Sequence, residues 1–179
     1  MLPVAFRAAA LAPIIAAAAC RYDGVPAITA ATPVEIDGVG PIRIGMPLAD
    51  ARRLLGDDLA VSESAAGSTC AYATPKSGPG GLSFMLDDRV IVRIDVTGGA
   101  MRTEHGIAVG SAEAQVLEAY AHSTEVTPHK YDAEGHYVVV KSPGGERRNL
   151  RYVFETSRGV VTKFRAGALP AVGYVEGCS

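Results

Sequence analysis

Two histidines with carboxylates between them form the stretch of this chain best suited to chemistry. His129 and His136 bracket the sequence PHKYDAEGH, which also contains Asp132 and Glu134. Imidazole and carboxylate groups that converge can bind zinc or act as acid–base pairs. The stretch lacks an H-E-x-x-H motif, and its polarity is typical of a loop that runs into a strand. A small-ligand or hydrolase site at residues 129–136 is therefore the alternative hypothesis, and the main one assigns no catalytic, metal or cofactor residue.

Composition and motifs exclude several other classes of function. The chain has 17 Lys and Arg against 19 Asp and Glu, a net charge of −2, and no run of basic residues. Nucleic-acid binding is therefore not expected, because phosphate contacts need clustered cations. No G-x-S-x-G nucleophile motif occurs. The glycine-containing runs at 77–81 and 142–146 do not lead from a strand into a helix, as a phosphate-binding loop would.

Residues 1–20 are typical of a bacterial secretion signal. Arg7 precedes an apolar run at 8–19, which is too short to span a membrane and suits a signal peptide. Two small residues and then Cys20 resemble the lipobox, in which the cysteine becomes the lipidated first residue. Arg21 in the next position points to the outer membrane. The predicted location is an outer-membrane lipoprotein facing the periplasm, and ordinary cleavage to a soluble periplasmic or secreted protein is the alternative.

The cysteine count supports the same compartment. The chain has three cysteines, and lipidation of Cys20 would leave Cys70 and Cys178 as an even pair. Two such cysteines in an oxidising compartment are expected to form a disulfide, here between the C-terminus and the first half of the chain. A free reactive thiol at Cys70 is the alternative, although the sequence places no cation beside it to lower its pKa.

An internal duplication is the main signal about architecture. Residues 42–56, IRIGMPLADARRLLG, match residues 107–121, IAVGSAEAQVLEAYA, in pattern, and residues 82–96 match 150–166. Each copy has apolar residues at helical spacing, followed by alternating residues on both sides of a polar turn. The sequence thus predicts two copies of a helix followed by an antiparallel hairpin.

The predicted fold class is therefore α+β. Two tandem repeats, each with one helix or a helix pair followed by a hairpin or meander, pack as one domain. The predicted boundaries are a signal peptide at 1–20, a flexible tether at 21–36, a first repeat at 37–103 and a second repeat at 104–179. The second repeat ends in a tail that the disulfide ties back.

A glycine–methionine helix start and an acidic hairpin carry a resemblance to known envelope proteins. The residues concerned are Gly45, Met46, Gly56, Leu86, Asp87 and Val92 in the first copy, and Gly110, Phe154 and Glu155 in the second. With these residues, each unit resembles the BamE/SmpA-type lipoproteins of outer-membrane protein assembly, and the tandem pair resembles the beta-lactamase inhibitory proteins, which bind enzymes on a concave sheet. The resemblance implies fold more than function, because these positions are structural.

The function expected from these observations is non-catalytic. The chain is predicted to be an envelope lipoprotein that binds another envelope protein, with the lipid anchor as its contact to the membrane. Exposed aromatic and basic side chains commonly dominate such interfaces. The candidate contact residues are Tyr131, His136, Tyr152 and Arg165.

Overall fold

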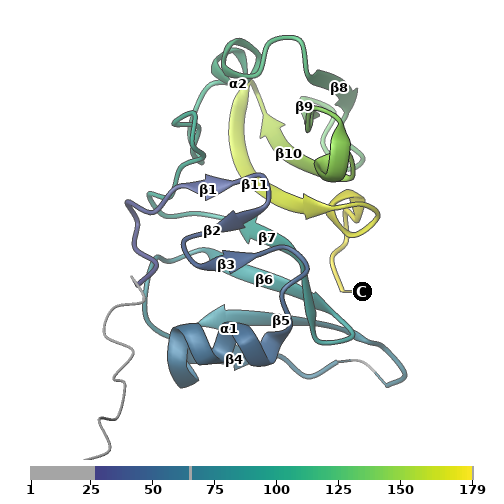
Figure 1. The fold of residues 1–179 in the computed structure, drawn as a ribbon. Helices are drawn as coiled ribbons and strands as arrows, with labels where there is room; N and C mark the ends of the chain where they lie inside the picture. The colour runs from purple at the N-terminus through teal and green to yellow at the C-terminus, as the bar shows by residue number, and fades with distance from the viewer. Residues whose placement is uncertain (1–26, 65, 179) are drawn as a thin grey trace, which may run out of the picture.

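The structure, a computed structural model, describes residues 27–64 and 66–178. A three-stranded sheet has the order β1-β2-β3, and an eight-stranded sheet has the order β4-β5-β6-β7-β11-β10-β9-β8 (Figure 1). All neighbouring strands are antiparallel. The small sheet consists of β1 (Val34–Glu35), β2 (Gly38–Val39) and β3 (Ile42–Arg43). The large sheet consists of β4 (Leu59–Val61), β5 (Cys70–Pro75), β6 (Leu82–Asp87), β7 (Val90–Val96), β8 (Thr124–Pro128), β9 (Gly135–Lys141), β10 (Leu150–Ser157) and β11 (Val160–Ala168).

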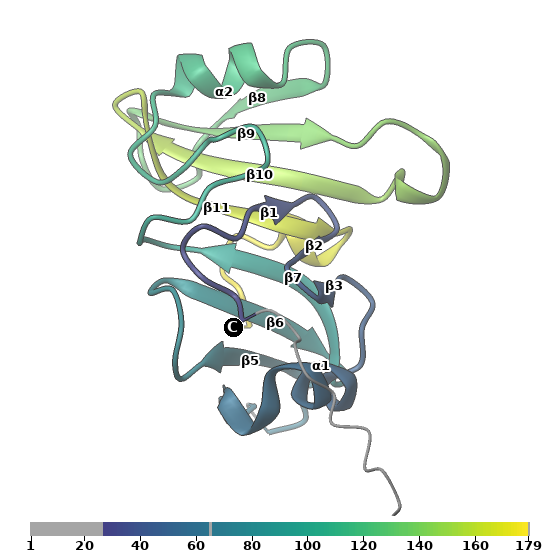
Figure 2. The same cartoon turned by 60° about the vertical axis from the view of Figure 1, so that its left-hand side comes forward.

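The large sheet is built from two halves with the same element order. Helix α1 (Leu48–Leu55) precedes β4 to β7, and helix α2 (Glu113–Ala119) precedes β8 to β11. The halves join where β7 pairs with β11, from Arg93 opposite Gly167 to Val96 opposite Phe164. The two helices lie toward opposite ends of the sheet, with the small sheet between them (Figure 2). Residues 27–64 and 66–178 also include three short 3₁₀ turns, η1 (Gly56–Asp58), η2 (Gly145–Arg147) and η3 (Ala171–Gly173).

The predicted α+β fold of helix-plus-hairpin repeats is wrong, because the chain is mostly β. The helices contain only eight and seven residues, whereas the large sheet runs through eight strands. Both predicted hairpins exist as β6–β7 and β10–β11, but two further strands extend each of them. Of the added strands, β4, β5 and β8 are short or carry small and polar side chains, and β9 (GHYVVVK) is a continuous apolar run, so none of them gives a clear alternation of apolar and polar residues.

The main core lies between the large sheet and the elements that cover one face of it. Alternate residues of the strands point to this face, which we call the helix face, and pack against Leu48 and Ala51 of α1 and Val116 of α2. The bulky side chains that the eight-stranded sheet contributes to this core include Phe84, Ile94, Tyr152, Phe154 and Phe164. The strand residues in between point to the opposite face, which we call the polar face. The candidate site lies on this face.

Two tight turns set the register of the central hairpins. Asp88 and Arg89 connect β6 to β7 with φ of 46° and 61°, and Arg158 and Gly159 connect β10 to β11 with φ of 49° and 75°. Positive φ at both central residues is the type I′ geometry, which matches the twist of the strands. Each hairpin also has a register shift a few residues beyond its turn, between Met85 and Leu86 in β6 and at the equivalent place in β10.

A glycine at the first turn is expected to stabilise the fold. Arg89 adopts φ of 61°, where a side chain costs about 1 kcal/mol and glycine fits without strain. We expect Arg89→Gly to raise the free energy of unfolding by about 0.5 kcal/mol in urea denaturation, after the entropic cost of glycine. Gly159→Ala at the matching turn should lower it, since nothing within 4 Å would touch the new Cβ and only the backbone is affected. A loss of stability in Arg89→Gly would contradict this.

The structure tests the N-terminal predictions only from residue 27 onward. The signal peptide and Cys20 lie outside the described residues and stay predictions. The flexible tether to residue 36 is wrong from residue 28 on, because Ile28 and Val34 are part of the main core. Apolar side chains spaced between small and turn-forming residues anchor this segment to the sheet. Within the described part of the chain, no helix has the length and apolar character to cross a membrane.

Candidate functional site

Three cross-strand rows of side chains make up the centre of the polar face. One row contains Tyr72, Met85, Arg93, Gly167 and Arg151, and the next contains Ser83, Asp95, Arg165 and Val153. Lys163, Glu155 and Tyr137 form the third. The register of the sheet therefore brings charged groups from β7, β10 and β11 together where its two halves meet.

Arg93 is the central charged residue of this face. Its side chain is almost fully buried, with 4% exposure. Its Nε donates to Asp95 at 2.8 Å, and one terminal nitrogen donates to the Tyr72 hydroxyl at 2.7 Å. The other terminal nitrogen donates to the backbone oxygens of Ala171 and Tyr174, at 3.0 and 2.8 Å. A buried guanidinium with all of its groups paired thus fixes the chain beyond β11 to the centre of the sheet.

A second buried network surrounds Glu155, which has 1% exposure. Its carboxylate accepts hydrogen bonds from Arg165 and from His129, and Lys163 lies 3.1 Å away. Burial raises the pKa of Glu155, but the hydrogen bonds from His129 and Arg165 outweigh burial and hold that pKa below its ordinary value. Arg165 also donates to the backbone oxygen of Val172 at 2.7 Å.

These two arginines hold the C-terminal segment, residues 170–178, against the polar face. Val172 is fully buried and packs with Tyr137 and Val153 in a small second core. Further along, Cys178 forms a disulfide with Cys70, and their sulfurs are 2.09 Å apart. The pairing expected from the cysteine count is therefore compatible with the structure. The segment covers one part of the polar face and leaves the Thr74 side open.

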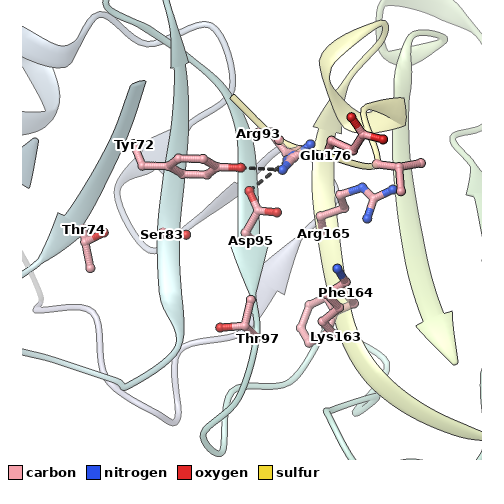
Figure 3. A pocket seen from close by; sticks show the side chains of 12 residues that line it. Tyr72, Thr74, Ser83, Arg93, Asp95, Thr97, Lys163, Phe164, Arg165 and Glu176 are labelled. Carbon is pink, nitrogen blue, oxygen red and sulfur yellow. Dashed lines mark hydrogen bonds and ion pairs between the residues drawn. The ribbon is translucent and has the colours of Figure 1, made fainter. Parts of the chain in front are cut away.

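An open cavity of about 340 Å³ lies beside this segment (Figure 3). Its floor carries short polar side chains together with Asp95, and Lys163 and Arg165 lie at its β11 side. Val175, Glu176 and Gly177 line its other side. Burial raises the pKa of the Tyr72 phenol in this cavity, so Tyr72 is a neutral hydrogen-bonding group at physiological pH. The cavity can receive a polar group or a side chain of a bound molecule.

The other side of the C-terminal segment borders a second open cavity, of about 480 Å³. Both cysteines of the disulfide line it, together with Lys130 and again residues 175–177. Lys130 donates to Glu176 at 2.9 Å, and the Tyr131 hydroxyl donates to the same carboxylate. These hydrogen bonds hold the pKa of Glu176 below its ordinary value. Residues 175–177 therefore form a wall that the two cavities share.

The structure does not bring His129 and His136 together. The His129 ring stacks on Tyr137 on the polar face, with ring centroids 4.5 Å apart. His136 is the preceding residue of β9, so it points to the helix face, where it contacts Glu113 of α2 at 3.0 Å. Both nitrogens of His129 are engaged, because Nε2 donates to Glu155 and Nδ1 accepts from the Tyr131 backbone. His129 is thus a structural residue in this arrangement rather than a free base or ligand.

Thr156, Glu113 and His136 form a triad in the wrong order for nucleophilic catalysis. The Thr156 hydroxyl donates to Glu113 at 2.5 Å, and His136 contacts the same carboxylate oxygen. Burial raises the pKa of Glu113, but these two hydrogen bonds give it a net pKa below its ordinary value. A catalytic triad needs the histidine between hydroxyl and carboxylate, whereas here the carboxylate is in the middle. Within residues 27–64 and 66–178, no group of three His, Cys, Asp or Glu could hold a metal ion.

Of the four predicted contact residues, two are accessible and two are not. Tyr131 is 62% exposed, and the His136 side chain is 46% exposed. The prediction that Tyr152 and Arg165 are exposed is wrong, since they are 1% and 4% exposed. The Tyr152 hydroxyl donates to the backbone oxygen of Val34 at 2.8 Å in the main core. Arg165 is covered by the C-terminal segment.

Sequence reasoning missed the residues around Arg93 and Glu155. Charges that alternate with apolar residues in a strand are typical of an exposed face, and these strands follow that pattern. The cysteine pair, from which the sequence predicts a tied-back tail, also indicates which face of the sheet the tail covers. Cys70 and Tyr72 point to the same face of β5, so a disulfide from Cys70 to Cys178 requires the end of the chain to cross that face.

Comparisons with known proteins show a likeness in fold. A scan of protein-family models finds no match, and a search of curated protein sequences finds no significant one. Among solved structures, the chain is similar to the uncharacterized protein YfeY from Escherichia coli, with a TM-score of 0.50 and 18% sequence identity. The match covers 76% of this chain and 99% of that chain. At this identity the likeness concerns the fold alone.

Proposed function

We propose that the protein is a non-catalytic binding module of the bacterial envelope, which binds another protein. Its binding face consists of the two cavities beside the C-terminal segment and of three exposed apolar side chains next to them. These side chains are Tyr131, Leu169 and Tyr174. The predicted lipid anchor on Cys20 would hold this module on the outer membrane, facing the periplasm, and a disulfide suits that oxidising compartment.

The observation that carries the proposal is where exposed apolar residues gather. Six large apolar side chains are exposed in the described part of the chain, and half of them lie on or beside the C-terminal segment. Tyrosine is enriched at the energetic centres of protein interfaces, because its ring buries a large area and its hydroxyl binds polar groups. Cavities beside such residues can receive side chains from a partner.

Site-specific photocrosslinking in the envelope tests this proposal. A photoreactive phenylalanine analogue at position 131 or 174 keeps an aromatic ring in place, and we expect it to give a discrete adduct with a second protein. Val126 and Val160 are matched controls, because they are similarly exposed and line neither cavity. We expect several-fold higher adduct yield at 131 and 174 than at these positions. Equal yields at all four positions, or none at 131 and 174, would contradict the proposal.

A further inference from the structure

We propose that the disulfide between Cys70 and Cys178 is a redox control of the binding face. In the oxidised chain it keeps residues 175–178 on the polar face and so assembles that face. Reduction by a dithiol releases these residues and disassembles it. The consequence for binding rests on the proposed function, whereas the release itself is a property of the chain alone.

The two parts of the C-terminal segment are held by different forces. Residues 171–174 are fixed by buried groups: Arg93 and Arg165 bind three of their backbone oxygens, and Val172 is fully buried. Val175 is partly buried and packs against the small second core, so it is held in part by apolar contacts. Residues 176–178 have the disulfide, together with the contacts of Lys130 and Tyr131 to the exposed Glu176. Exposed ion pairs contribute little to stability. The disulfide is therefore the main restraint on the end of the segment, residues 176–178.

Release of residues 175–178 would change the site that they border. They form the wall shared by the two cavities, so both cavities would open into one groove. Gly177 packs on Tyr72 so closely that a Cβ there would lie 2.7 Å from the hydroxyl, and its departure would uncover the phenol. Tyr131 would lose its hydrogen bond to Glu176. A face that must be ordered again at binding has lower affinity than a preformed one.

The position of the disulfide makes it accessible to a reductant. Cys70 and Cys178 are only partly buried, and both line the open cavity of about 480 Å³. A thiolate of the dithiol attacks one sulfur and forms a mixed disulfide, and the other cysteine leaves as a thiolate. The second thiol of the reductant then displaces the remaining cysteine. The disulfide is reduced to two thiols, and the dithiol is oxidised to its own disulfide.

Backbone ¹⁵N relaxation on the mature chain, with and without dithiothreitol, tests the release. We expect the order parameters of residues 175–178 to fall from about 0.85 to below about 0.6 in the reduced chain and in Cys178→Ser. Those of Gly173 and Tyr174, whose amides donate to Pro170 and Ala171, should stay high, as should those of β7 and β11. High order parameters at 175–178 in the reduced chain would overturn the proposal, and so would a fall throughout the sheet.

Nitration of Tyr72 provides a second measurement that does not depend on removing a cysteine. We expect reduction to increase nitration at Tyr72 several-fold, mapped by mass spectrometry. Gly177→Ala keeps both cysteines, but its Cβ would lie 2.7 Å from the Tyr72 hydroxyl at a backbone φ of 70°, so this contact must open and nitration should rise in the oxidised chain. Unchanged nitration after reduction would contradict the model of release.

Crosslinking from position 131 then separates this inference from the proposed function. We expect the adduct yield in Cys178→Ser to fall about tenfold relative to the oxidised chain. An unchanged yield with a released segment would overturn redox control of binding and leave the binding face intact. A complete lack of adduct in the oxidised chain would instead contradict the proposed function, and the relaxation results would still decide whether the segment is released.

Discussion

Arg93→Met is expected to lower the free energy of unfolding by about 3–5 kcal/mol, as measured by urea denaturation at pH 7. Methionine has a similar length and fits a buried site, but it cannot donate any of the hydrogen bonds of the guanidinium. Asp95 would lose its buried counter-charge, and the backbone oxygens of Ala171 and Tyr174 would lose their donor. Leaving buried polar groups unpaired is among the most destabilising changes in a protein.

The matched control for this change is Arg158→Met. Arg158 also pairs with a carboxylate, that of Glu134 at 3.0 Å, but both side chains are largely exposed. Exposed pairs of this kind contribute little, so the midpoint of unfolding should hardly move. Equal losses in the two variants would show that Arg93 contributes no more than a surface arginine does, and that the C-terminal segment does not depend on it.

Glu155→Gln is expected to cost about 3 kcal/mol at pH 7, because it removes the counter-charge of Arg165. Both side chains are almost fully buried, so the cation would remain in a medium that solvates it poorly. Glu125→Gln is the matched control, since Glu125 pairs with Lys141 at the exposed edge of the same sheet. It should change the midpoint of unfolding very little.

The difference in stability between wild type and Glu155→Gln is expected to depend on pH. The pKa of Glu155 in the folded chain lies below the value of about 4.3 for an unpaired glutamate. The carboxylate therefore stabilises the fold fully above that ordinary value, and this contribution is lost as the pH falls through the folded pKa. The difference in stability between wild type and Glu155→Gln should narrow between pH 5 and about pH 3. A constant difference over this range would contradict the assignment.

Local sequence signals could predict the centre of the fold but not its extent. The alternation of Leu82, Phe84 and Leu86 correctly predicts β6, and Gly56, with φ of 70°, ends α1 where the pattern indicates. Proline is common at the first position of a helix, but Pro47 lies just before α1. A serine ahead of a helical pattern is a typical N-cap, but the Ser111 hydroxyl accepts from the Ala108 backbone in the preceding turn.

Three strands were not predicted because their sequences carry only a weak strand signal. β4 has three residues, and β8, with the sequence TEVTP, is an exposed edge with a single aliphatic side chain. On the helix face, β5 contributes only Ala71 and Ala73 to the main core, and larger side chains from neighbouring elements fill the core around them. Small residues give a weak alternation, so tertiary packing decides these strands rather than local preference.

The candidate site depended even more on long-range contacts. The sequence patterns of β7 (VIVRIDV) and β11 (VVTKFRAGA) predict that their charged side chains lie in solvent. In the structure, residues near the end of the chain bury these side chains. No local pattern contains this information. Only the cysteine pair links the two regions in the sequence.

The junction of β7 and β11 has a consequence for how the chain reaches its native state. The first half ends its meander at β7, whose free edge finds its partner only when the last strand arrives. Such pairing gives a high contact order and slow folding. Until then, β7 presents unpaired amide and carbonyl groups that another nascent copy can capture. Chaperone protection during assembly is therefore most needed at an edge that the finished molecule no longer has.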